Sequence, residues 1–99
     1  MKRIVISTDD RYATMIYKQI LEKEGHNTLI AETPDEALIY LEIYDTDMLL
    51  TDYRNDAVDR DLIKRAREIY KQPIIRITPL LEMLPSEMEV VTLRKPIEI

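Results

Sequence analysis

Short apolar runs alternate along the chain with longer segments whose apolar residues recur at helical spacing. The apolar runs predict five strands, at residues 2–7, 28–31, 47–51, 73–78 and 89–94. The periodic segments predict helices at residues 10–24, from Thr33 to about Tyr44 and from about Asp59 to Tyr70. The expected inward residues are Tyr12 or Ala13, Ile16, Ile20 and Leu21, then Ala37, Leu38 and Leu41, then Leu62, Ile63, Ala66 and Ile69.

Residue types at the helix ends support these assignments. Asp9 or Asp10 is expected to cap the first helix, and Gly25 is a natural residue just after its end. Thr33 caps the second helix, with Pro34 in its first turn and Glu36 three residues after the cap. Two prolines lie within residues 79–88, so no long helix is expected there.

Strands that alternate with helices predict an α/β fold with a parallel, doubly wound sheet of the flavodoxin type. The expected strand order is 2-1-3-4-5, and residues 1–99 are expected to form a single domain. Arg76 interrupts the fourth strand, and Thr92 and Arg94 interrupt the fifth. Because strands buried on both faces are continuously apolar, one face of these two strands is expected to be partly wet or covered by another chain.

Composition narrows the functional classes. The net charge of −5 argues against direct nucleic-acid binding, because phosphate backbones require a basic face. The chain has no cysteine and one glycine, which excludes thiolate chemistry and a Gly-rich phosphate loop. No apolar run approaches the ~20 residues of a membrane span, so a cytoplasmic protein is expected. Phosphate chemistry would then need side chains and a metal ion.

Charged residues follow three of the predicted strands. Asp9 and Asp10 follow the first strand, Asp52 follows the third, and Lys95 follows the fifth. Ligands bind at the carboxyl ends of strands in open α/β sheets, so these side chains are expected to converge on a cation and phosphate site. Taken singly, each residue has a simpler interpretation, as a helix cap, a loop residue or a solvated lysine.

The ordered set of motifs resembles a response-regulator receiver domain of the chemotaxis-receiver type. The resemblance extends from Lys2 to Pro96 and rests on Asp9-Asp10, Asp52, Thr78 and Lys95-Pro96, each after its own strand. The run from Asp47 to Asp52 is similar to the family's segment leading into its phosphoacceptor aspartate.

The resemblance implies a phosphoryl switch rather than a conventional enzyme, with at most self-catalysed transfer onto Asp52 and its hydrolysis. It implies that Mg²⁺ is held by Asp9, Asp10, Asp52 and the backbone carbonyl of Arg54. It also implies that Lys95 pairs with the phosphoryl oxygens and that Thr78 hydrogen-bonds to them. The implied partners are a sensor histidine kinase or phosphotransfer protein, and a downstream protein or partner domain.

Several positions depart from the family's pattern. The sequence ends at Ile99, so the family's fifth helix is expected to be absent. The interval from Thr78 to Lys95 is short, so the fourth helix is expected to be short or absent. Thr92 stands at the family's aromatic switch position, and Pro79 stands where a small residue is usual. The loop at residues 53–60 lacks the family's Pro and Gly. These departures suggest a homodimer, or a partner domain, packed on strands four and five.

Two other functions compete with an active receiver. The first is a pseudo-receiver, in which the same fold serves as a phosphorylation-independent binding or dimerisation module; Thr92, Pro79 and the shortened end favour it. The second is a small Mg²⁺-dependent phosphohydrolase with Asp56 as its second acid. The chain has little material with which to enclose a substrate, which disfavours the hydrolase.

Overall fold

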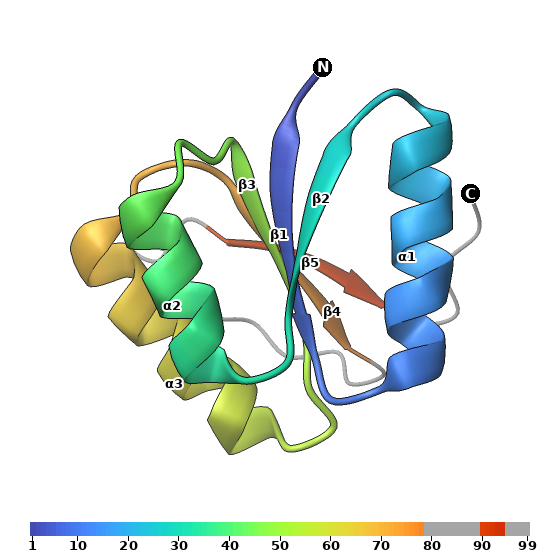
Figure 1. The fold of residues 1–99 in the computed structure, drawn as a ribbon. Coiled ribbons are helices and arrows are strands. Elements are labelled where there is room, and N and C mark those ends of the chain that lie inside the picture. The colour runs from blue at the N-terminus through green and yellow to red at the C-terminus, as the bar shows by residue number, and fades with distance from the viewer. Residues whose placement is uncertain (79–89, 95–99) are drawn as a thin grey trace.

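A parallel sheet lies between helices on its two faces (Figure 1). The computed structural model describes residues 1–78 and 90–94, with the backbone alone for residues 78 and 90–94. The strands are β1 (Arg3–Thr8), β2 (Asn27–Ala31), β3 (Met48–Asp52), β4 (Ile74–Thr78) and β5 (Val90–Arg94). The helices within the described residues are α1 (Arg11–Lys23), α2 (Pro34–Ile43) and α3 (Asp56–Ile69). The order β2-β1-β3-β4-β5, with every pairing parallel, confirms the predicted topology.

The predicted helix ends are confirmed for α1 and α2. After α1, Gly25 adopts a φ of 89°, and its N–H donates to the carbonyl of Glu22 while that of His26 donates to the carbonyl of Leu21. This pair of bonds closes the helix, and a side chain at Gly25 would be strained by that φ alone. At the start of α2, the Thr33 hydroxyl accepts a hydrogen bond from the Glu36 N–H at 3.1 Å.

The third helix begins earlier than predicted. Asn55 caps α3 by accepting a hydrogen bond from the Ala57 N–H at 2.9 Å, so the helix starts at Asp56 and not near Asp59. The first turn of α3 has one adjacent apolar pair, Ala57-Val58, between two acids, and such a pair shows no helical period. The expectation of a short or absent fourth helix falls on residues 79–89, outside the described residues, as does everything after Arg94.

Two apolar clusters hold the layers together, one on each face of the sheet. Helices α2 and α3 cover one face, and α1 covers the other (Figure 1). The cluster under α2 and α3 contains Val5, Ala31, Ala37, Leu41, Leu49, Tyr53, Leu62, Ile63, Ala66, Tyr70 and Ile74. The cluster under α1 contains Ile4, Ile6, Ala13, Tyr17, Leu50 and Ile77. None of the helices in residues 1–78 is both long and apolar enough to cross a membrane.

Two helical residues expected in the core lie at the surface instead. Ile16 is 36% exposed and Ile69 is 45% exposed, whereas Tyr17 and Tyr70 are buried. Tyrosine satisfies both requirements of these positions, because its ring fills the core and its hydroxyl reaches a polar partner. Tyr70 shows this directly, since its hydroxyl donates to the backbone carbonyl of Thr46 at 3.1 Å.

The expectation that Arg76 marks a partly wet face is wrong. Arg76 is 1% exposed and lies under α3, where its Nε donates to Asp59 Oδ2 at 3.0 Å. Its guanidinium also forms an ion pair with Asp56 at the start of α3. A buried cation costs a large desolvation penalty unless it is paired, and here two carboxylates from one helix provide the pairing. The charge in β4 therefore ties the strand to α3 and gives no support for a second chain at this position.

The carboxyl group of Asp59 is as deeply buried as its partner. Burial raises the pKa of Asp59 to about 6, against the opposing effect of hydrogen bonds from the Thr51 hydroxyl and the Tyr53 backbone N–H. The guanidinium of Arg76 acts in the same direction as these hydrogen bonds, because a nearby cation favours the ionised carboxylate.

We predict that Arg76→Met lowers the free energy of unfolding by about 3–5 kcal/mol at pH 8, because it leaves a buried carboxylate unpaired. Without Arg76 the pKa of Asp59 should rise further above its unfolded value. Stability gained from the neutral acid is then fully present below the unfolded pKa and is lost as pH rises through the folded pKa. Urea unfolding should accordingly show a smaller loss at pH 5 than at pH 8.

The matched control is Arg65→Met. Arg65 forms ion pairs with Asp35 and Asp61 at 3.2 and 3.6 Å, but all three side chains are substantially exposed. Exposed pairs contribute about 0–1 kcal/mol, so this variant should unfold nearly as the wild type does. Two results would contradict the assignment of a buried ion pair. One is an equal loss of unfolding free energy in the two variants, and the other is a loss in Arg76→Met that is the same at both pH values.

Candidate functional site

The ends of β1 and β3 bring two acidic segments to one edge of the sheet. Thr8, the last residue of β1, pairs with Asp52, the last residue of β3. Asp9 and Asp10 follow Thr8 directly, so they leave the sheet beside Asp52. The side chains of Leu49 and Leu50, which precede Asp52 in β3, are buried on opposite faces of the sheet. Asp52 itself is only 2% exposed.

Asp10 caps the first helix. Its Oδ1 accepts hydrogen bonds from the backbone N–H groups of Tyr12 and Ala13 at 2.9 and 3.2 Å. Its own backbone N–H donates to the Thr8 hydroxyl at 3.1 Å, which fixes the turn between β1 and α1. The second carboxylate oxygen lies 4.0 Å from the guanidinium of Arg54, an exposed side chain from the loop after β3. The carboxylate is thus held in place by the positive end of α1.

Tyr17 connects α1 to the carboxylate of Asp52. The Tyr17 hydroxyl donates to Asp52 Oδ2 at 2.5 Å, between two side chains that are both buried. Burial raises the pKa of Tyr17 well above its ordinary range, and the hydrogen bond and the charges of Asp52 and Asp10 add to the shift. The phenol therefore keeps its proton and acts as a hydrogen-bond donor to the carboxylate.

Asp59 fixes the backbone on either side of Asp52. Its Oδ1 accepts from the hydroxyl of Thr51 at 2.6 Å and from the backbone N–H of Tyr53 at 3.2 Å. Side chains alternate along a strand, so these neighbours face α3 while Asp52 faces α1. The backbone that carries the Asp52 carboxylate is therefore held from the opposite side of the sheet.

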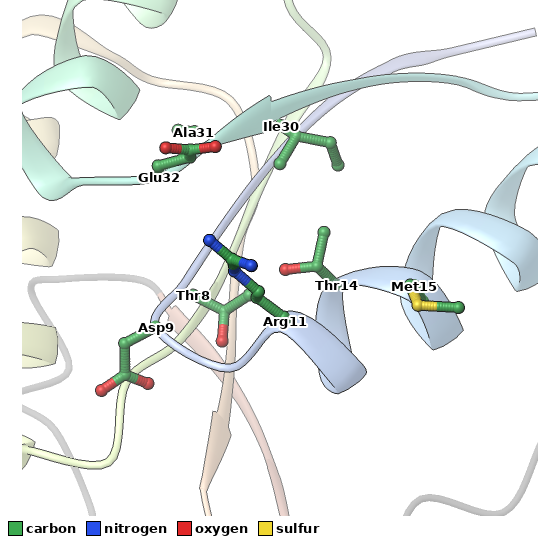
Figure 2. Close-up of a pocket in the computed structure, with 8 residues that line it drawn as sticks. All are labelled: Thr8, Asp9, Arg11, Thr14, Met15, Ile30, Ala31 and Glu32. Atoms are coloured by element: carbon green, nitrogen blue, oxygen red, sulfur yellow. The ribbon is translucent and has the colours of Figure 1, made fainter.

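A cleft of about 460 Å³ opens beside this edge (Figure 2). It is lined by Thr8, Asp9, Arg11, Thr14, Met15, Ile30, Ala31 and Glu32. Figure 2 shows the guanidinium of Arg11 extending from the start of α1 toward the end of β2, where Glu32 lies. Asp52 does not line this cleft, which therefore lies next to the buried carboxylate and not over it.

Some of the predicted site residues lie together in the structure, and others fall outside the described residues. Asp9, Asp10 and Asp52 come to one edge of the sheet, with Asp9 exposed, Asp10 partly buried and Asp52 buried. Within residues 1–77, no group of three or more acidic, histidine or cysteine side chains is arranged to hold a metal ion. Lys95 and the side chain of Thr78 lie outside the described residues, so their roles stay predictions.

Sequence patterns did contain a signal for the residues that were missed. Tyr17 lies four residues after Ala13 and four before Leu21, which makes it part of the buried stripe of α1. Arg76 interrupts an apolar strand, and a buried arginine requires an acidic partner. Asp59 is that partner, but its distance in sequence gave no means of selecting it from the acidic residues of α3.

Comparison with known proteins supports one family. The transcriptional regulatory protein CpxR of Klebsiella pneumoniae is 33% identical over 79 residues, which are 79% of this chain and 34% of the relative. The receiver domain of the hybrid histidine kinase CckA is 27% identical, with a TM-score of 0.78 over 97% of this chain and 87% of that one. By fold and by sequence likeness, the chain is a receiver domain.

A second solved receiver-type structure has the same fold. It is the response regulator TrrA of Thermotoga maritima in complex with Mg²⁺-BeF, with 24% identity and a TM-score of 0.83 over 96% of this chain and 87% of that one. No protein-family model matches the chain. The receiver domain spans about a third of the length of the curated relatives that it matches.

The cap on α1 can be tested apart from any role in binding a metal. Asp10→Ala should lower the free energy of unfolding by about 0.5–2 kcal/mol, because two N–H groups lose their acceptor. Asp10→Asn should lose less, because the amide oxygen can still accept those bonds. Thr33→Ala, which removes the cap of α2, is the control and should cost a similar amount in the same urea titration. Equal losses for Asp10→Asn and Asp10→Ala would contradict a capping role.

Proposed function

We propose that this receiver domain is the phosphoacceptor module of a two-component signalling system, with Asp52 as the acceptor. The observation that carries the proposal is the position of Asp52 at the carboxyl end of β3, beside the segment from Thr8 to Asp10. In open parallel sheets, this edge is where ligands bind. The similarity to receiver domains over most of the chain supports the same assignment.

The acidic residues have the chemistry that Mg²⁺ requires. This ion prefers oxygen ligands and is usually held by one or two carboxylates, with waters and a phosphate oxygen completing its coordination. Asp9, Asp10, Asp52 and the backbone carbonyl of Arg54 would supply such ligands. The Mg²⁺-BeF complex of TrrA is consistent with this proposal. When bound, the ion would offset the negative charge of the transferring group.

The reaction would be a simple phosphoryl transfer. A carboxylate oxygen of Asp52 forms a bond to phosphorus, and the bond from phosphorus to the donor breaks, leaving its electron pair on the donor. The product carries about −1.5 to −2 charge at a position that is 2% exposed. We propose that Lys95 pairs with this charge and that Thr78 hydrogen-bonds to it. A change of this size in a buried site can bias the surrounding elements between two arrangements.

The partners follow from the same proposal. Phosphate would come from a sensor histidine kinase or a phosphotransfer protein, and the output would be an altered contact with a downstream protein or partner domain. The curated relatives are named transcriptional regulatory proteins, and the chain covers only 34% of their length, so their regulatory activity is not proposed for this chain. We propose that residues 1–99 act as one such module in the cytoplasm.

Phosphorylation can be tested by mass spectrometry. With Mg²⁺ and acetyl phosphate, the wild type should gain the mass of one phosphoryl group. Asp52→Asn should gain none, because an amide is not a nucleophile for this reaction. Asp35→Asn, which changes an exposed acid on α2, is the control and should react as the wild type does. EDTA should abolish the gain in the wild type and in Asp35→Asn.

A failure of the wild type to gain this mass, while a reference receiver does so in parallel, would overturn the proposal. The same fold would then be assigned to a phosphorylation-independent binding module. A gain that survives in Asp52→Asn would also count against the assignment, because it would place the phosphoryl group on another residue.

A further inference from the structure

A tyrosine hydroxyl donates a hydrogen bond to the carboxylate that would accept the phosphoryl group. The Tyr17 hydroxyl donates to Asp52 Oδ2 at 2.5 Å, which is within the range of hydrogen bonds to charged oxygen. Tyr17 is 8% exposed and Asp52 is 2% exposed, so solvent hardly competes for either group. The contact joins α1 to the end of β3.

The phenol is held in this position by the packing of its ring. Tyr17 belongs to the apolar cluster under α1, which includes Ala13, Leu50 and Ile77. The Tyr17 hydroxyl is the donor in the hydrogen bond to Asp52 Oδ2, so the phenol carries its proton in this structure. A protonated phenol beside a carboxylate can only donate its hydrogen bond, and it cannot act as a base toward an incoming group.

We propose that Tyr17 restrains phosphorylation of Asp52 by stabilising the unmodified carboxylate. This inference deepens the proposed function, on which it rests, and concerns the regulation of the same site. An interaction slows a step when it stabilises the starting state more than the transition state. The carboxylate oxygen carries its greatest negative charge before it attacks, and it loses that charge as its bond to phosphorus forms. A donor on this carboxylate is therefore worth most in the unmodified state.

Geometry and magnitude support the same direction. If Oδ2 is the attacking oxygen, the phenol occupies one of its two lone pairs and leaves phosphorus fewer directions of approach. If the other oxygen attacks, the hydrogen bond still draws electron density toward Oδ2 and weakens the nucleophile. Hydrogen bonds to charged groups are among the stronger ones in proteins, so the loss of part of one corresponds to a change in rate of about tenfold.

The test compares two variants that each remove one buried phenol. Tyr17→Phe removes the donor to Asp52 and keeps the ring in the core. Tyr70→Phe is the matched control, because Tyr70 is also buried and its hydroxyl donates to Thr46, a residue that lies before β3. Both are treated with acetyl phosphate and Mg²⁺ beside the wild type, and the rate of mass gain is measured. We expect Tyr17→Phe to react about tenfold faster and Tyr70→Phe to react at the wild-type rate.

Each outcome decides the inference. A Tyr17→Phe rate more than twofold above that of the wild type supports the inference. A Tyr17→Phe rate within twofold of the wild type, or a slower one, overturns the inference and leaves the phosphoacceptor role intact. If neither protein gains mass while a reference receiver does, both the restraint and the proposed function are overturned.

A second measurement separates restraint from a structural role. Urea unfolding of the same variants reports the free energy that each hydroxyl contributes to folding. A purely structural hydroxyl would lower stability when removed and leave the rate unchanged. Should Tyr17→Phe prove poorly folded, Tyr17→Leu fills the same cluster without a ring and carries the same expectation of faster phosphorylation. Equal rates in a folded Tyr17→Leu and the wild type would overturn the inference in the same way.

Discussion

The buried carboxylate of Asp59 is the interaction on which the candidate site depends. It joins three elements, because it accepts hydrogen bonds from Thr51 in β3, from the Tyr53 backbone and from Arg76 in β4 while it lies in α3 itself. A charge removed from water needs nearly all of its bonding capacity satisfied by the protein. The hydrogen bonds that Asp59 accepts therefore fix the end of β3. They restrict the movement of the backbone that carries Asp52.

The contacts that β3 makes differ between the two faces of the sheet. On the side of α3, a charged network holds the residues before and after Asp52. On the side of α1, the phenol of Tyr17 donates a hydrogen bond to the Asp52 carboxylate itself. A phosphoryl site needs a stationary backbone together with side chains that can rearrange when charge arrives. The receiver domain provides the first through Asp59, and Tyr17 is the side chain that contacts the carboxylate on the other face.

The sequence was sufficient for the order of elements, because five apolar runs alternating with helical periods permit few arrangements in a parallel sheet. It also brought Asp10 and Asp52 to one edge, since strand ends must meet there. The sequence did not show which side of α1 faces the sheet, because apolar residues occur on several sides of the helix. Ile16 was expected to be buried, whereas Tyr17 is the buried residue. Arg76 was misinterpreted because a charge in a strand indicates solvent unless its partner, distant in sequence, is known.

The alternation of β3 has a consequence for how such a chain can vary. Asp52 faces α1, while its neighbours Thr51 and Tyr53 face the network under α3. A deletion or insertion of one residue within β3 would exchange the two sets. It would bring an acid into the cluster around Leu49 and withdraw the carboxylate from Tyr17. The length of this strand is therefore under a stricter constraint than the identity of most of its residues, and variation in length should be confined to the loops.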